Sequence, residues 1–124
     1  MASWQAFSFG GHFATLSKLA LHHSEYQAIM AGYDPNSAPA PAAVQTRFGI
    51  TYQVDAGPPV RFAFDGNGLL NNWNGIVFDP TETVAEARGW DSHHHRAREL
   101  KQLFGSNLGS CSHLWGAYYD CSFS

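Results

Sequence analysis

Residues 48–54 read FGITYQV and residues 60–64 read VRFAF. In both stretches a large apolar side chain stands at every second position, with small or polar side chains between. Side chains on a β-strand point alternately to its two faces, so this period of two predicts strands with one buried face. The segment between the stretches contains Asp55, Gly57 and two prolines. Because such residues form turns, we expect the strands to pair antiparallel.

The same alternation returns at the end of the chain. Its predicted apolar face consists of Cys111, His113, Trp115, Ala117, Tyr119, Cys121 and Phe123. The segment forms either one long strand or a hairpin that turns at Gly116. One extended strand would hold the two cysteines about 33 Å apart, whereas the hairpin would place them opposite each other and permit a bridge. We expect two buried free thiols, because disulfides are rare in cytosolic proteins.

Apolar residues spaced three to four apart predict helices on either side of the central strands. Such spacing occurs in residues 12–30 and in residues 92–104. In the first segment two short helices that meet near His23 compete with one long helix. For residues 80–88, a helix capped by Asp79 competes with a turn followed by a short strand. The remaining expected elements are a first strand at 3–9, a turn at Gly66-Asn67-Gly68 and a strand at 69–79. The predicted class is α+β: a curved antiparallel sheet of five or six strands with two or three helices packed on one face.

The composition indicates a folded domain with a surplus of aromatic residues. The 124 residues are 44% hydrophobic, 15% aromatic and 14% charged, whereas soluble domains carry about 25% charged residues. We therefore expect a single domain that spans residues 1–124. Its aromatic content exceeds what a core of this size absorbs, which predicts that some aromatic side chains line a pocket or a subunit interface.

Charge and hydropathy argue against two classes of partner. The net charge is -3, and the basic residues form no dense stripe of the kind that binds phosphates, so we expect no nucleic acid. No stretch approaches the roughly 20 apolar residues of a membrane span. Residues 1–9 lack the positively charged start and long apolar run of a signal peptide. From these features we expect a cytoplasmic protein.

The histidines and cysteines do not predict a metal centre or an active site. His93, His94 and His95 are adjacent, and neighbouring residues on a helix point about 100° apart, so three such imidazoles cannot converge on one ion. His95 and Glu99 form one pair with metal-binding spacing, which a surface hydrogen bond explains equally well. A thiolate and imidazole pair would need tertiary convergence of a cysteine with His23 or His113. We expect no metal and no cofactor, and the missing motifs favour a non-enzymatic protein over an enzyme.

Binding is the remaining class of function. Candidate ligand or interface residues are those that combine an aromatic or imidazole ring with a predicted apolar face or a loop: Trp73, His113, Trp115, Tyr119, His23 and Tyr26. Our first hypothesis is a non-enzymatic interaction module that self-associates or binds a protein partner through an aromatic-rich surface. The alternative is a small pocket protein, possibly an enzyme, that holds an apolar or aromatic molecule between helix and sheet.

Overall fold

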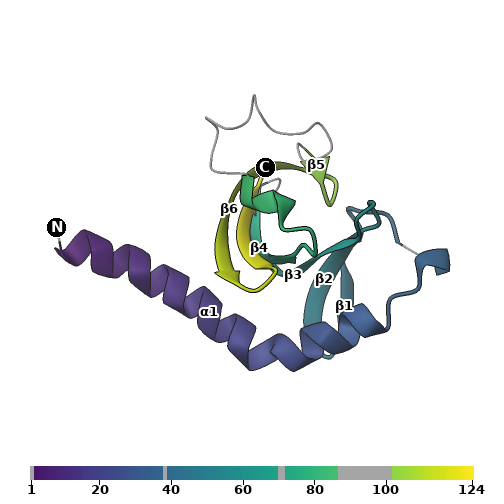
Figure 1. The fold of residues 1–124 in the computed structure, drawn as a ribbon, viewed down its shortest axis with the longest axis horizontal. Helices are drawn as coiled ribbons and strands as arrows, with labels where there is room; N and C mark the ends of the chain where they lie inside the picture. Colours follow the sequence, from purple (N-terminus) through teal and green to yellow (C-terminus); the bar gives the residue numbers. More distant parts are fainter. Residues whose placement is uncertain (1, 38, 70–71, 87–101) are drawn as a thin grey trace.

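A computed structural model describes the backbone of residues 2–37, 39–69, 72–86 and 102–124. The chain forms one long helix and a curled sheet, with one short 3₁₀ segment between helix and sheet and a second one inside the curl (Figure 1). The helical elements are α1 (Ala2–Ala31), η1 (Pro35–Ser37) and η2 (Thr83–Glu86). The strands are β1 (Gln45–Arg47), β2 (Ile50–Asp55), β3 (Arg61–Leu69), β4 (Asn72–Phe78), β5 (Gln102–Leu103), β6 (Ser106–Trp115) and β7 (Tyr118–Phe123).

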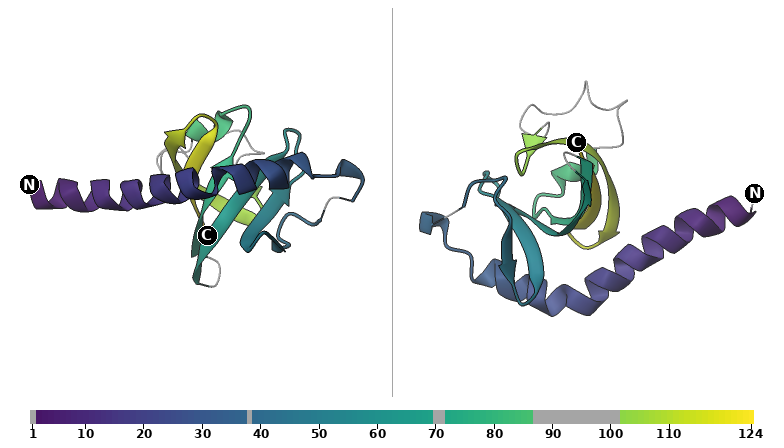
Figure 2. Two further views of the ribbon diagram at one scale, coloured as in Figure 1. Left: turned by 90° about the horizontal axis from the view of Figure 1, so that it is seen from below. Right: turned by 180° about the vertical axis from the view of Figure 1, so that it is seen from behind.

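All seven strands of the described chain pair antiparallel in the order β1-β2-β3-β4-β7-β6-β5. The sheet curls into a half-barrel, and α1 crosses its outer face (Figures 1 and 2). The expectation of a curved antiparallel sheet is therefore confirmed. The α+β class with five or six strands and two or three helices is wrong, because the described residues contain one α-helix and are mostly sheet.

α1 is one continuous helix, so the strand expected at residues 3–9 is wrong. That expectation gave weight to Trp and Phe, which favour strands, and to a Gly pair that resembles a break. Such propensities amount to less than about 1 kcal/mol per residue and yield to their context. The stripe expected further along the helix is confirmed by Leu19 and Tyr26, which are buried against the sheet, and by Leu16 and Met30, which pack at its margin.

The FGITYQV stretch is a hairpin as well as a strand. Phe48 and Gly49 have positive φ angles of 56° and 75°, and they form the two-residue turn between β1 and β2. Two consecutive left-handed residues are typical of the tight turns that match strand twist. Ile50 and Val54 are buried as the alternation predicts, whereas Phe48 lies exposed at the turn.

β3 continues through the glycines that were expected to end it. The strand runs to Leu69, and its register with β4 shifts between Phe64 and Asn67. Asp65 has a φ of 55° at this shift, which identifies a β-bulge rather than a turn. Gly66-Asn67-Gly68 therefore belongs to the strand, and the expected turn at these residues is wrong.

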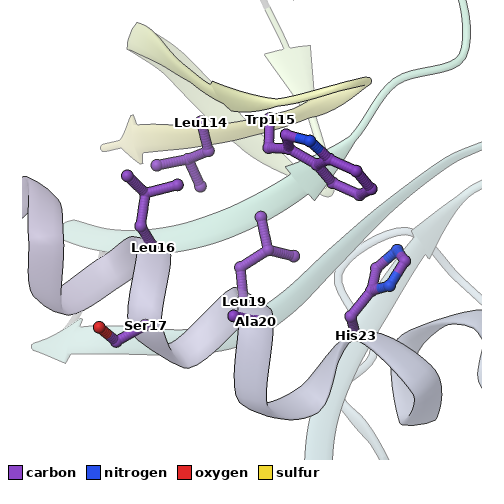
Figure 3. A pocket seen from close by; sticks show the side chains of 7 residues that line it. All are labelled: Leu16, Ser17, Leu19, Ala20, His23, Leu114 and Trp115. Atoms are coloured by element: carbon purple, nitrogen blue, oxygen red, sulfur yellow. The ribbon is translucent and has the colours of Figure 1, made fainter.

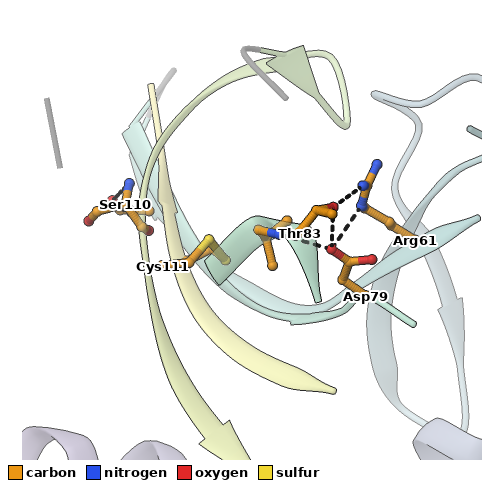
Figure 4. Close-up of a disulfide and its surroundings, with 8 residues drawn as sticks. Arg61, Asp79, Thr83, Ser110 and Cys111 are labelled. Carbon is orange, nitrogen blue, oxygen red and sulfur yellow. Dashed lines mark hydrogen bonds and ion pairs between the residues drawn. A yellow bond between two sulfur atoms is a disulfide. The ribbon is translucent and has the colours of Figure 1, made fainter. Parts of the chain in front are cut away.

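β6 and β7 form the hairpin that was one of two alternatives. Gly116, with a φ of 58°, lies in its turn, and Cys111 pairs directly with Cys121 across the strands. Their Cα atoms are 4.1 Å apart and their sulfur atoms are bonded (Figure 4). The expectation of two free thiols is wrong: it rested on an assumed reducing compartment, whereas the hairpin register already brings the cysteines together.

Between β4 and β6 the structure differs from both alternatives for residues 80–88. Thr83–Glu86 is a short 3₁₀ helix, and residues 87 and 88 lie outside the described part. The helix expected at residues 92–104 is wrong at its C-terminal end, where Gln102 and Leu103 form β5. Residues 92–101, with His93, His94, His95 and Glu99, lie outside the described residues.

Both faces of the sheet are buried, by different elements. The outer cluster lies beneath α1 and contains Leu19, Tyr26, Ile29, Ile50, Val54, Phe62, Phe64, Ile76, Leu114 and Tyr118. The inner cluster lies within the curl and contains Ala63, Val77, Val84, Leu103, Phe104, Leu108, Tyr119, Cys121 and Phe123. Adjacent strand residues alternate between the clusters, as the pleat requires. No helix among the described residues combines the length and apolar character that crossing a bilayer requires.

Candidate binding groove

An apolar groove of about 620 Å³ lies between α1 and the end of β6 (Figure 3). We call it the α1–β6 groove. The described residues that line it are Leu16, Ser17, Leu19, Ala20, His23, Leu114 and Trp115. The helical members lie three to four residues apart, so they share the side of α1 that faces the hairpin.

A β-bulge in β6 supplies the other wall of the groove. Neighbouring residues in a regular strand point to opposite faces, so Leu114 and Trp115 would not both face α1. The register shifts between His113, which pairs with Tyr119, and Trp115, which pairs with Tyr118. Leu114 is the extra residue, and a bulge of this kind redirects side chains. Leu114 is buried against α1 while Trp115 stands 59% exposed at the rim.

Aromatic rings surround His23 on the hairpin side of the groove. The His23 imidazole lies edge-on to Trp115 at 5.2 Å and to Tyr118 at 5.5 Å between ring centroids. Edge-to-face packing of this kind fixes ring orientation and contributes about 0.5–1.5 kcal/mol per pair. Burial raises the pKa of Tyr118 to about 12, so its hydroxyl is neutral at ordinary pH.

Tyr26 anchors the helix beneath the groove. It is fully buried, its ring stacks on Phe64 at 4.2 Å, and its hydroxyl donates a hydrogen bond to the Asp65 carboxylate. Burial, followed by the hydrogen bond and charge of Asp65, raises the pKa of Tyr26 well above its usual range. Asp65 also lines a separate polar hollow of about 150 Å³ under α1, together with Thr15, Lys18, Asn74, Gly75, Ile76 and Asp120.

The six candidate residues do not form one site. His23 and Trp115 line the groove, and Tyr26 supports it from below. The other three lie toward the inner face: Tyr119 belongs to the inner cluster, Trp73 packs against that cluster, and His113 lies beside Tyr119. The separation follows from the hairpin, because its turn and bulge break the odd-position pattern on which the sequence argument relied.

The inner-face aromatics have structural partners. Trp73 stacks on Phe123 at 4.1 Å, and its indole N–H donates to Ser106 Oγ at 3.0 Å. The His113 ring nitrogen lies 2.9 Å from the Gly116 carbonyl oxygen across the hairpin turn. These contacts explain the two rings as packing elements of the hairpin and the inner cluster.

Sequence reasoning named Leu16 and Leu19 only as core residues and missed Ala20 and Leu114. The apolar stripe of the helix could have predicted the wall that α1 contributes to the groove, because the stripe continues beyond the residues that pack on the sheet. The second wall carried no signal, since nothing in the sequence around Leu114 marks a bulge. With one imidazole and one hydroxyl among apolar side chains, the lining has the composition of a binding surface.

The other buried polar cluster joins the end of β4 to β3 and η2 (Figure 4). Asp79 is inaccessible to solvent and accepts hydrogen bonds from Thr81 and from the Val84 backbone. Arg61 Nε lies 3.3 Å from the Asp79 carboxylate, as an ion pair without a hydrogen bond. Burial alone would raise the pKa of Asp79, but the hydrogen bonds and the Arg61 charge outweigh it and lower that pKa. Asp79 was expected to cap a helix over residues 80–88; instead its carboxylate accepts from the amides of Thr81 and Val84 at the start of η2.

Within the described residues, no three His, Cys, Asp or Glu side chains lie close enough to hold a metal ion. Comparison of the chain with protein-family models, with curated proteins and with solved structures finds no match. The choice of the α1–β6 groove as the candidate binding site therefore depends on its geometry alone.

Proposed function

We propose that the protein is a non-enzymatic interaction module, and that its α1–β6 groove receives an apolar segment of a protein partner or of a second copy. The observation that carries this proposal is Trp115, a large aromatic side chain that stands 59% exposed beside a concave apolar surface. Tryptophan is among the residues that contribute most to protein interfaces, above all next to a pocket. Leu21, 73% exposed on α1, adds apolar surface on the same helix.

The size of the groove supports a second candidate, a pocket for an apolar or aromatic small molecule. Small-molecule sites occupy about 300–1,000 Å³ and are lined mainly by apolar side chains with a few polar groups. The groove has a volume of about 620 Å³, with Ser17 and His23 as its polar members. Under either candidate the groove binds through Trp115, and the two differ only in what they bind.

Substitution at Trp115 tests both candidates. The native mass of the full-length chain should exceed that of a monomer, and Trp115→Ala should weaken the association about 30-fold, the loss expected for a tryptophan contributing about 2 kcal/mol. Phe48→Ala is the matched control, since Phe48 is also exposed, at 56%, on the β1–β2 turn.

A monomeric protein would exclude a second copy as the partner, and a small apolar probe would then test the groove itself. The apolar dye ANS should then bind the wild-type chain and the Phe48→Ala variant but not Trp115→Ala. A monomer that binds no dye, or an association that Trp115→Ala leaves intact, would contradict the groove as a binding site.

The disulfide bears on where such a module works. The cytoplasmic location expected from the sequence stays a prediction, and the Cys111–Cys121 bridge weighs against it because disulfides persist mainly in oxidising compartments. We infer a protein of an oxidising compartment. Mass spectrometry of alkylated protein from its natural source should find both thiols blocked from alkylation; two alkylated cysteines would support the cytoplasm instead.

A further inference from the structure

We propose that the occupant of the α1–β6 groove is the N-terminal half of α1 from a second copy of this chain. The inference rests on the proposed function and deepens it by naming the partner. The two copies would be related by a two-fold axis, with their α1 helices antiparallel, so that each helix fills the groove of the other. An interface of this kind is isologous, because the same surface serves both copies.

The first observation concerns charge. Residues 2–17 contain no Asp, Glu, Lys or Arg, and the first charged side chain of the sequence is Lys18. The same segment carries four large aromatic residues, Trp4, Phe7, Phe9 and Phe13. A surface helix ordinarily shows a charged or polar face to water. A helical segment that is both uncharged and aromatic-rich therefore calls for an apolar surface to cover it.

The second observation concerns position. Figures 1 and 2 show α1 crossing the outer face of the sheet and then continuing past it, with no other described element beside its N-terminal half. This half is continuous with the residues that line the groove, from Leu16 to His23. The N-terminal half of α1 and the groove thus adjoin along the axis of one helix. When two copies pair through α1 about a two-fold axis, the N-terminal half of each helix lies in the groove of the other copy.

The third observation concerns complementarity. The described residues that line the groove include no Asp, Glu, Lys or Arg, so a charged helix would lose water there without gaining an ion pair from them. An uncharged helix pays no such penalty. Ala20, midway along the helical wall, is exposed and small, which permits two helix backbones to approach closely.

Three variants of the full-length chain test the inference by light scattering over a wide concentration range. Ala20→Lys places a charge in the groove, and Phe9→Lys places one in the proposed occupant, at a position that helical spacing puts on the same side of α1 as Ala20. Each should raise the dimer dissociation constant about a hundredfold, because a charge would be buried without a partner. Ala28→Lys is the matched control: Ala28 is an exposed alanine of the same helix that does not line the groove. It should leave the dimer intact, and circular dichroism checks that all variants fold.

The outcomes separate this inference from the proposed function. A dimer that survives either Ala20→Lys or Phe9→Lys would overturn the α1 pairing. A monomeric wild-type chain that still binds ANS through Trp115 would overturn the pairing and leave the small-molecule candidate standing. A monomer that binds no dye would overturn both. Loss of the dimer in both variants, with Ala28→Lys unchanged, would establish the helix of a second copy as the occupant.

Discussion

Replacing Asp79 by Asn should destabilise the fold by about 4 kcal/mol. Asp79 is 0% exposed and its ion-pair partner Arg61 is 4% exposed, so water cannot solvate the arginine once the carboxylate is gone. Breaking a buried pair by removing one charge costs about 3–5 kcal/mol. Asn keeps the shape of the side chain, and the loss therefore reports the charge and its hydrogen bonds.

The hydrogen bonds set the size of the effect. One carboxylate oxygen accepts from the Thr81 amide and hydroxyl, and the other accepts from the Thr83 hydroxyl and the Val84 amide. A carboxamide has a single acceptor oxygen. Its NH₂ group would therefore face two of these donors, and both would lose their acceptor. A buried donor that loses its partner costs about 1–3 kcal/mol, which places the total within the range for a broken pair.

Urea denaturation of the oxidised protein measures the loss. With a slope of about 2 kcal/mol per molar urea, the midpoint should fall by about 2 M. Asp34→Asn is the control, because the exposed Asp34 also accepts from a backbone amide and a hydroxyl, those of Asn36 and Ser37. It should leave the urea midpoint close to that of the wild type, because water solvates the exposed carboxylate. A loss below about 1 kcal/mol for Asp79→Asn would refute the reasoning that breaking this buried ion pair leaves Arg61 as an unpaired charge without water.

The acid limb of the stability curve gives an independent check. Folding lowers the pKa of Asp79 below its ordinary value of 3.8. The contribution of this carboxylate to the free energy of unfolding is therefore complete above pH 3.8 and is lost as the pH falls through the lower pKa of the folded protein. The Asp79→Asn variant lacks this group. Its stability should therefore decline less steeply than that of the wild type as the pH falls below about 4.

Three further predictions concern the hairpin and the helix anchor. Reducing Cys111–Cys121, which are 10 residues apart, should lower the free energy of unfolding by about 2–3 kcal/mol; thermal melts with and without reductant that coincide would contradict it. Tyr26→Phe removes the hydroxyl that donates to Asp65 and should cost about 1–2 kcal/mol in urea, unless that bond contributes nothing. The pKa of Tyr118 is raised from 10.0 to about 12, so its contribution is full below pH 10 and is lost as the pH rises toward 12; Tyr118→Phe should flatten this decline.

The sheet was the predictable part of the fold. Ile50 and Val54 in one stretch and Phe62 and Phe64 in the other are buried on one face as their spacing required, because a period of two is a direct consequence of strand geometry. The residues between them, such as Ala63, were taken for a solvent face and are buried as well. The curl of the sheet encloses that second face, and a pattern of apolar and polar residues does not show that a curved sheet closes far enough to bury both faces.

The site was predictable only in part, because local irregularities decide it. His23 and Trp115 were identified by ring type and predicted face, and both line the groove. Leu114 was missed since an insertion of one residue in a strand has no propensity signature. The same insertion separates Trp115 from His113, which the alternation had placed on one face. The bulge at Leu114 thus explains why Trp115 lines the groove as expected while His113 does not.

Exposed aromatic residues in this chain differ in what holds them, and that difference favours Trp115 as the binding residue. Phe48 stands on a two-residue turn with the Arg47 guanidinium 5.0 Å from its ring, so a cation already covers one face. Trp115 lies on a hairpin held by the Cys111–Cys121 bridge and by a hydrogen bond from the Asp79 amide to the Ala117 carbonyl. A side chain on a rigid support loses less entropy on binding than one on a mobile loop. The rigid hairpin therefore presents Trp115 in place, which is the arrangement expected where an exposed tryptophan serves to bind.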